Sequence, residues 1–172
     1  MPAALRPGSR GYTLGHSESD VYWMERAIER ARDAAAENEV PVGAVLVREG
    51  QMLAEGWNLT ETHQDPTGHA EMVAIRLGSE LAGSRRLANT TLYVTLEPCS
   101  MCAGAAVLAR IPRIVFGAYD VKGGACGTLR NIAQDPRLNH RCDVTGGVLQ
   151  EQCAKLLSEF FERLRKGDEA RS

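Results

Sequence analysis

The sequence predicts an α/β domain built from a layered arrangement of helices and a sheet. Segments with strand character alternate with segments of helical periodicity, in the order helix, two strands, helix, strand, helix, strand, short strand, helix. Residues 114–118 are continuously apolar, as in a strand covered on both faces. The chain has 172 residues, of which 44% are hydrophobic, so one domain can bury a core of its own.

The N-terminal part of the domain is expected to begin with a helix. Residues 1–16 contain prolines and glycines without apolar periodicity and predict a mobile tail. Ser17 is the expected helix cap, paired with Asp20 as in a capping box, and apolar residues then recur at helical spacing until Pro41. Two strands follow at 42–47 and 52–57, joined by a turn. Residues 58–68 are polar and predict a loop.

The remaining elements continue the alternation. A helix is expected from residue 69, with Thr67 as its cap and Gly83 beyond its end. A strand at 91–96 leads into a helix that begins at Pro98 and reaches residue 110. A strand at 114–118, a last strand within 142–149 and a helix at 150–165 complete a domain at 17–166. Residues 167–172 are expected to be a second mobile tail.

Composition narrows the class of protein. The net charge is −2, but residues 1–102 carry nine basic and fourteen acidic side chains, whereas residues 103–172 carry eleven and eight. This excess of basic groups in the second part is compatible with a local phosphate-binding surface or with an ordinary solvated surface. No apolar run is long enough to cross a membrane. Five cysteines, an odd number, indicate the reducing cytoplasm and not a disulfide framework.

Two short motifs carry the chemistry. His69 and Glu71 open one expected helix, and Pro98 precedes Cys99 and Cys102 at the start of another. The two cysteines, three residues apart in a first helical turn, lie on one face, and the helix N-terminus favours the thiolate form that binds metal. One imidazole and two thiolates form a ligand set that suits zinc and leaves a fourth tetrahedral position for water.

An open position distinguishes a catalytic zinc from a structural one. Zinc lowers the pKa of a bound water to about 7, so hydroxide is available at neutral pH. Glu71, which the metal does not need as a ligand, is the expected carrier of the proton from that water to a leaving nitrogen. A histidine-x-glutamate followed by proline-cysteine-x-x-cysteine is the pattern of zinc nucleobase deaminases.

Other polar residues near these motifs have simpler interpretations. Glu97 is expected to accept backbone N–H bonds at a helix start. Cys126, Cys142 and Cys153 are expected to be small buried residues. His63 or His140 as a fourth ligand would close the metal site, and the domain would then be a zinc-stabilised binding module without enzymatic activity.

The chain resembles the cytidine deaminase superfamily and, within it, the bacterial tRNA-specific adenosine deaminases. The similarity runs from about residue 22 to residue 165. It includes, besides the zinc motifs, the segments 41–45, 56–58, 65–67, 91–99, 101–105, 115–118, 139–141 and 160–161. The resemblance implies a three-layer αβα fold with a central mixed five-stranded sheet. It also implies one zinc per subunit, a homodimer, and conversion of adenosine to inosine at the first anticodon (wobble) position in a tRNA anticodon stem-loop.

The resemblance also assigns roles to individual residues. It makes His69, Cys99 and Cys102 the zinc ligands and Glu71 the catalytic proton shuttle. The implied substrate-binding residues are Val42, Asn58, Ala70, Pro98, Asp120 and Lys122. The basic and aromatic residues of the last helix match the family only loosely, and Gly68 and Asp135 depart from its pattern. A deaminase of a free base or nucleoside, such as guanine, cytosine or cytidine, shares the metal set and is the alternative.

Overall fold

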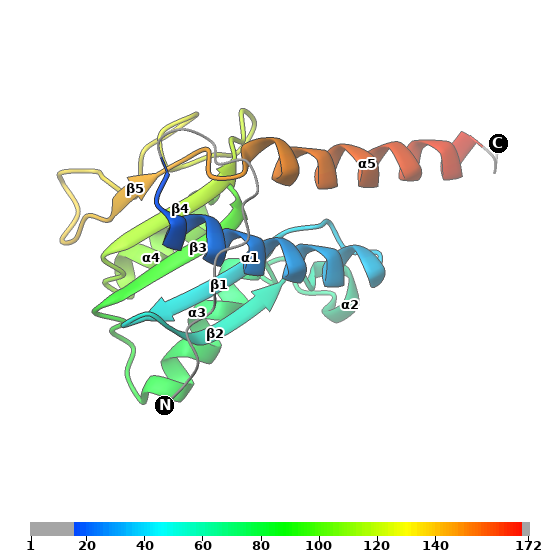
Figure 1. Cartoon of the computed structure of the whole chain (residues 1–172). Helices are drawn as coiled ribbons and strands as arrows, with labels where there is room; N and C mark the ends of the chain where they lie inside the picture. Colours follow the sequence, from blue (N-terminus) through cyan, green and yellow to red (C-terminus); the bar gives the residue numbers. More distant parts are fainter. Residues whose placement is uncertain (1–15, 170–172) are drawn as a thin grey trace.

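A five-stranded mixed sheet forms the centre of the molecule. The computed structural model describes residues 16–169, so almost all of the expected N-terminal tail lies outside the described residues. The strands are β1 (Gly43–Arg48), β2 (Gln51–Trp57), β3 (Thr90–Leu96), β4 (Arg113–Ala118) and β5 (Asp143–Thr145), arranged in the order β2-β1-β3-β4-β5. β1 pairs antiparallel with β2 and β3, while β3, β4 and β5 are parallel (Figure 1). The predicted α/β fold with a mixed sheet is confirmed.

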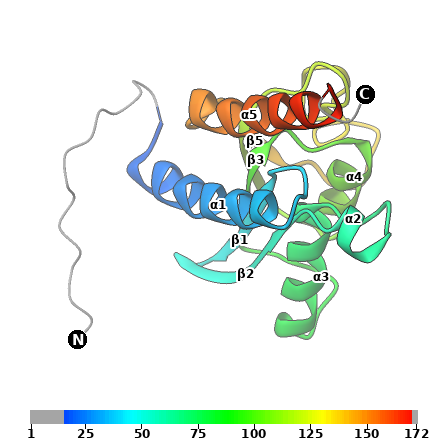
Figure 2. The same ribbon diagram turned by 90° about the vertical axis from the view of Figure 1, so that its right-hand side faces the viewer.

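Helices cover both faces of this sheet. α1 (Glu18–Ala36) and α5 (Gln150–Glu169) lie on one face, and α3 (Ala70–Ala82) and α4 (Ser100–Leu108) lie on the other (Figure 2). The alternation of side chains along a strand explains the two layers. In β3, Leu92 and Val94 join the core under α3 and α4, whereas Tyr93 points to the core under α1 and α5. Strand β4 divides in the same way and is buried on both faces, as its continuous apolar run predicts.

The helix starts are defined by local hydrogen bonds. Ser17 caps α1 by accepting a hydrogen bond from the Asp20 amide at 3.1 Å, as predicted. The expected Thr67 cap of α3 is wrong: His69 occupies the cap position, and Thr67 instead donates to Asp65 in the preceding turn. α4 begins at Ser100, two residues later than expected, because Cys99 has the extended backbone of a cap. The metal motifs therefore lie at helix N-termini, with His69 and Cys99 as the caps.

Two further differences concern helix lengths. A short helix, α2 (Thr60–His63), lies in the segment predicted to be a loop, where Gln64 ends it in a left-handed conformation. α5 continues to Glu169, four residues past its expected end at residue 165, and residues 170–172 of the expected C-terminal tail lie outside the described residues. Its last turns extend beyond the sheet (Figure 1) and are supported by the i, i+4 pair of Lys166 and Glu162 at 2.8 Å. Among the described residues, no helix has the length and apolarity needed to span a membrane.

Candidate metal centre and active site

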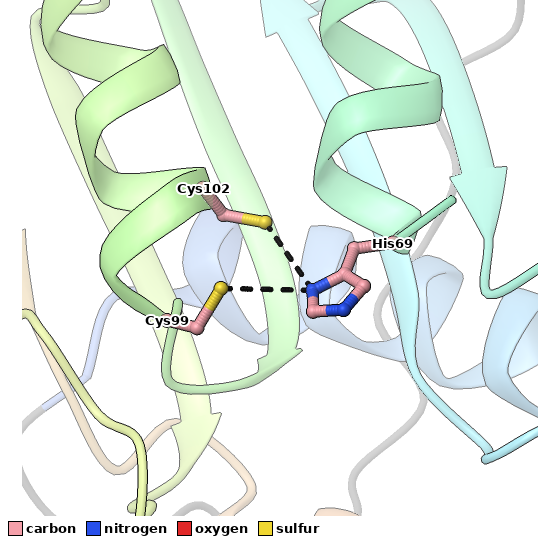
Figure 3. A group of neighbouring side chains, drawn as sticks. All are labelled: His69, Cys99 and Cys102. Carbon is pink, nitrogen blue, oxygen red and sulfur yellow. Dashed lines mark hydrogen bonds between the residues drawn. The ribbon is translucent and has the colours of Figure 1, made fainter. Parts of the chain in front are cut away.

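Three side chains from two helix N-termini converge beyond one edge of the sheet. His69 follows the connection from β2 to α3, and Cys99 and Cys102 follow the connection from β3 to α4. The Sγ atoms of Cys99 and Cys102 each lie 3.6 Å from Nδ1 of His69 (Figure 3). His69 and Cys99 are half-buried, and Cys102 is fully buried. The sequence predicts this grouping, and the structure brings the three residues together.

The distances fit a tetrahedral zinc ion. Zinc–sulfur bonds of about 2.3 Å and zinc–nitrogen bonds of about 2.05 Å, meeting at the tetrahedral angle, place sulfur and nitrogen about 3.6 Å apart. This separation agrees with both Sγ to Nδ1 distances. In the described part of the chain, no fourth His, Cys, Asp or Glu joins this group of ligand atoms. The donor set therefore fits zinc through Nδ1 of His69 and two sulfurs, with one tetrahedral corner left for a small molecule.

The electrostatics of the two cysteines favour metal binding. Hydrogen bonds from the Cys102 thiol and from His69 lower the pKa of Cys99 to about 3, so a thiolate forms at neutral pH. The proton shared with that thiolate, together with burial, raises the pKa of Cys102. The hydrogen bond to Cys99 also raises the pKa of His69. A divalent cation would displace these shared protons, because thiolate and neutral imidazole are the ligand forms that zinc takes.

Glu71 is buried beside this group. It is the second residue of α3, only 4% exposed, and it lines the same cavity as His69 and Cys99. Burial raises the pKa of its carboxyl to about 7, and the neighbouring charge on His69 opposes this rise. A carboxyl group with a pKa near neutrality is suited to both accepting and donating a proton at working pH.

A cavity of about 220 Å³ opens onto the metal group. This volume is below the roughly 300 Å³ at the lower end of pockets for drug-sized ligands. It therefore suits a single planar group such as a nucleobase, with the rest of a larger ligand outside. The lining residues include Val42, Asn58, Ala70 and Asp120, four of the residues that the resemblance assigns to substrate binding.

The two other predicted substrate residues do not line the cavity. Pro98 is buried, and its carbonyl accepts a hydrogen bond from the Ala125 amide at 2.8 Å. Lys122 is exposed, and its amide donates to the Asp120 carboxylate at 2.9 Å. Pro98 thus holds the loop after β4 against the metal motif, and Lys122 lies on the outer side of that loop, where only a ligand that extends beyond the cavity would reach it.

Glu97 organises the same loop. The side chain is 1% exposed, and its carboxylate accepts hydrogen bonds from the amides of Asp120, Cys126 and Thr128 at 3.0–3.2 Å. The prediction that Glu97 accepts backbone N–H bonds is correct, but the donors belong to this loop and not to the start of α4.

Cys126, Cys142 and Cys153 are buried free cysteines, as expected. His140 contacts the Ile111 carbonyl at 2.7 Å and is not part of the metal group.

Sequence reasoning missed part of the cavity wall. Val40, Thr60 and Leu96 line the cavity, and Glu39 lies behind Asn58 with no exposed surface. The available signal for Glu39 was a single charge directly before the apolar run that begins at Val40. No sequence signal marked Thr60, whose place depends on the fold of α2.

Proteins of known family match the amino-acid sequence of this chain. The family model of the cytidine and deoxycytidylate deaminase zinc-binding region matches residues 17–118. A protein of Bacillus subtilis (strain 168) named tRNA-specific adenosine deaminase is 50% identical over 151 residues, which are 88% of this chain and 94% of that protein.

Solved structures agree with this relationship. One solved structure comes from biochemical and structural studies of A-to-I editing by tRNA:A34 deaminases at the wobble position of transfer RNA. Its sequence is 44% identical to this chain. The match covers 79% of this chain and 99% of the solved chain, with a TM-score of 0.75. The guanine deaminase of Bacillus subtilis is 41% identical over 58% of this chain and 62% of its own, with a TM-score of 0.53. The chain therefore belongs to the zinc-binding cytidine and deoxycytidylate deaminase family and, within it, to the tRNA-specific adenosine deaminases.

Proposed function

We propose that this enzyme hydrolyses adenosine to inosine and ammonia at the first anticodon position of a tRNA, with His69, Cys99 and Cys102 as the zinc ligands. The observation that carries the proposal is the triangle of one nitrogen and two sulfurs beside the buried Glu71, with no fourth protein ligand in the described part of the chain. A structural zinc normally has four protein ligands. The relatives and the structural neighbour with a tRNA:A34 deaminase function support the RNA substrate.

The residues around the cavity have complementary roles in this reaction. Zinc bound at this site supplies a water with a pKa of about 7 as the nucleophile. Glu71 would accept one proton of this water and deliver it to the purine ring nitrogen, and it would then carry the second proton of the same water to the departing amine, so that ammonia leaves and inosine results. The space proposed for the base is lined by Val42, Ala70 and Asn58. A nucleotide of a single-stranded anticodon loop is already unpaired, so little unstacking energy is needed to place its base in this space.

Asp120 and Lys122 are proposed to meet the nucleotides next to the target. Asp120 reaches the cavity and also anchors its own loop, because its carboxylate accepts bonds from the amides of Lys122 and Gly123 at 2.9 and 3.1 Å. The exposed Lys122 side chain offers a cation for a phosphate of the same strand.

A substrate panel tests the proposal. The purified enzyme is incubated with an unmodified anticodon stem-loop that carries adenosine at the first anticodon position. In parallel it is incubated with the same stem-loop carrying adenosine only elsewhere in the loop, and with free adenosine, cytidine, cytosine and guanine. We expect inosine only in the first RNA. The guanine deaminase neighbour makes free guanine the sharpest competitor, and activity confined to free bases would contradict the proposal.

A homodimer in the cytoplasm is the proposed assembly and location. The dimer is proposed from the resemblance to the tRNA-specific adenosine deaminases, and Leu108 on α4 and Val121 after β4, which are 73% and 75% exposed, are apolar side chains available to such an interface. All five cysteines are free, which fits a reducing compartment. Sedimentation equilibrium tests the assembly: we expect twice the chain mass of 18.7 kDa, and a monomer at micromolar concentration would contradict it.

A further inference from the structure

Glu39 is a buried carboxylate that pairs with no cation of the described residues. It has no exposed surface, and no ion pair within residues 16–169 involves it. The three other acidic residues that are buried in the described part of the chain have other surroundings: Asp20 pairs with Arg113, Glu71 lines the cavity beside the metal group, and Glu97 holds the loop after β4. A buried charge needs hydrogen bonds to offset its desolvation, and two of the residues that donate to Glu39, Asn58 and Thr60, belong to the cavity wall.

The bonds to Glu39 converge from three neighbouring residues. Nδ2 of Asn58 donates to Oε2 at 3.2 Å, and the Thr60 hydroxyl donates to the same oxygen at 3.4 Å. The Thr62 amide donates to Oε1 at 2.6 Å. Burial opposes ionisation of Glu39, but the bonds from Thr62 and Thr60 outweigh it and lower its pKa. The ionised carboxylate is then an acceptor on both oxygens.

This acceptor dictates the orientation of the Asn58 amide. A carboxylate accepts bonds from the amide nitrogen and repels the amide oxygen, so only Nδ2 can face Glu39. The same nitrogen also lies 3.3 Å from the Thr60 hydroxyl oxygen. Asn58 lines the cavity, and no group of residues 16–169 donates to its Oδ1. Arg30 Nε is the one buried side-chain polar atom in this part of the chain without a hydrogen bond, so Asn58 Oδ1 is accessible from the cavity.

We propose that Glu39 is a positioning residue that fixes the amide of Asn58 so that Oδ1 accepts a hydrogen bond from the substrate. The inference rests on the proposed function and adds a specificity rule to it: the part of the cavity wall formed by Asn58 favours a ligand with an N–H or O–H group there. The exocyclic amine of the target adenosine is the leaving group at the metal, so the donor left for Asn58 is the 2′-hydroxyl of its ribose. With an uncharged residue at position 39 this preference for a donor is lost, because the Asn58 amide can then turn and present Nδ2 to the cavity.

A double-mutant cycle tests the coupling between the two residues. Glu39→Gln keeps the shape of the side chain but offers both a donor and an acceptor to Asn58. We expect it to lower kcat/KM for the stem-loop by about tenfold to a hundredfold, the cost of misplacing a substrate-orienting group. In an Asn58→Ala background, the same change should alter kcat/KM by less than about twofold, because there is no amide left to orient.

Controls separate orientation from folding. Glu37→Gln is the matched control: Glu37 lies two residues earlier and is exposed, and the one side-chain hydrogen bond to it within residues 16–169 comes from the Trp57 indole N–H at 3.3 Å, so full activity is expected. Zinc content and thermal unfolding of each variant are measured in parallel. If Glu39→Gln does not fold, Thr60→Val replaces it in the cycle, because it removes a hydroxyl that contacts both Glu39 and Asn58.

Two results would overturn the inference: wild-type kcat/KM in Glu39→Gln, or an equal loss with and without Asn58. The second result would mean that Glu39 acts on the wall as a whole, through the Thr62 amide. A wild-type enzyme that forms no inosine in the stem-loop would instead refute the proposed function, and this outcome is visible before any variant is compared.

Discussion

At the scale of single residues, the site separates metal binding from proton transfer. Three side chains have the geometry of zinc ligands, and Glu71, two residues after His69, lies buried beside them without joining the group. The consequences of removing a ligand and of removing the proton carrier should therefore differ. A ligand variant should lose the metal, whereas a Glu71 variant should keep it and lose only turnover.

Glu71→Gln tests the proton transfer. The amide occupies the same volume but cannot carry a proton, so we expect kcat to fall by about 10² to 10⁴. Zinc content, measured by atomic emission, and stem-loop binding should be retained. Glu80→Gln on the exposed side of α3 is the matched control and should be fully active. A Glu71→Gln enzyme with wild-type turnover would remove Glu71 from the mechanism.

Cys102→Ala tests the ligand set. The substitution removes one of two sulfurs near His69 Nδ1, so we expect zinc content to fall from one ion per chain to well below one, with loss of activity. Cys142→Ala is the control, because Cys142 is equally buried but lies outside the metal group. Equal zinc content in both variants would show that Cys102 is not a ligand.

At the scale of elements, the strand ends and the loops that follow them supply most of the residues that line the cavity. The sheet, the helices that cover it and the convergence of His69, Cys99 and Cys102 were predictable, because apolar periodicity and motif spacing encode them locally. The connections were not. The α2 helix and the cap at His69 depend on contacts such as the bond from the Thr62 amide to Glu39, which joins residues 23 positions apart.

The apolar face of α5 shows the same limit. The apolar residues that recur at helical spacing along α5 include Cys153 and Phe160, which are buried, but also Phe161 and Leu164, which are 43% and 49% exposed. Periodicity predicts that these side chains share one side of the helix. Only the tertiary structure shows that the sheet covers the first turns of α5 and that the last turns extend past it (Figure 1).

Glu97→Gln tests the loop that the carboxylate organises. The amide nitrogen of glutamine would face a backbone N–H donor, so at least one of the bonds from Asp120, Cys126 or Thr128 is lost. We expect faster amide hydrogen exchange across 120–128 and a higher KM for the stem-loop, with zinc retained. Gly124→Ala should act in the same way, because a Cβ there would lie 2.4 Å from the Glu97 carboxyl group. Unchanged exchange in both variants would contradict this role.

At the scale of the whole molecule, one buried ion pair links the helical layer to the sheet. Asp20 on α1 accepts two bonds from Arg113 on β4, at 2.7 and 2.8 Å, and one from the Tyr93 hydroxyl on β3 at 3.0 Å. Burial opposes ionisation of Asp20, but these bonds outweigh it and lower its pKa below the ordinary value of 3.8. The carboxylate thus stabilises the folded state above that pH, and this stabilisation is lost as the pH falls through the lower folded-state pKa.

Asp20→Asn tests this link through pH. At pH 7 we expect the free energy of unfolding to fall by about 2 kcal/mol, less than for a fully buried pair because Arg113 is one-third exposed. The difference between wild type and variant, measured by urea unfolding, should shrink as the pH is lowered towards and below the folded-state pKa. Glu29→Gln, which breaks an exposed pair with Arg26, should cost much less. A difference that does not change with pH would contradict the ionised role of Asp20.

The whole account depends on a metal ion held by one imidazole and two thiolates, with one position left for water. X-ray absorption at the zinc edge of the purified enzyme measures this directly. We predict two sulfur ligands at about 2.3 Å and two nitrogen or oxygen ligands at about 2.0–2.1 Å, with one of the lighter ligands exchanging for a substrate analogue. Three or four sulfur ligands would mean a closed structural site and would contradict the account.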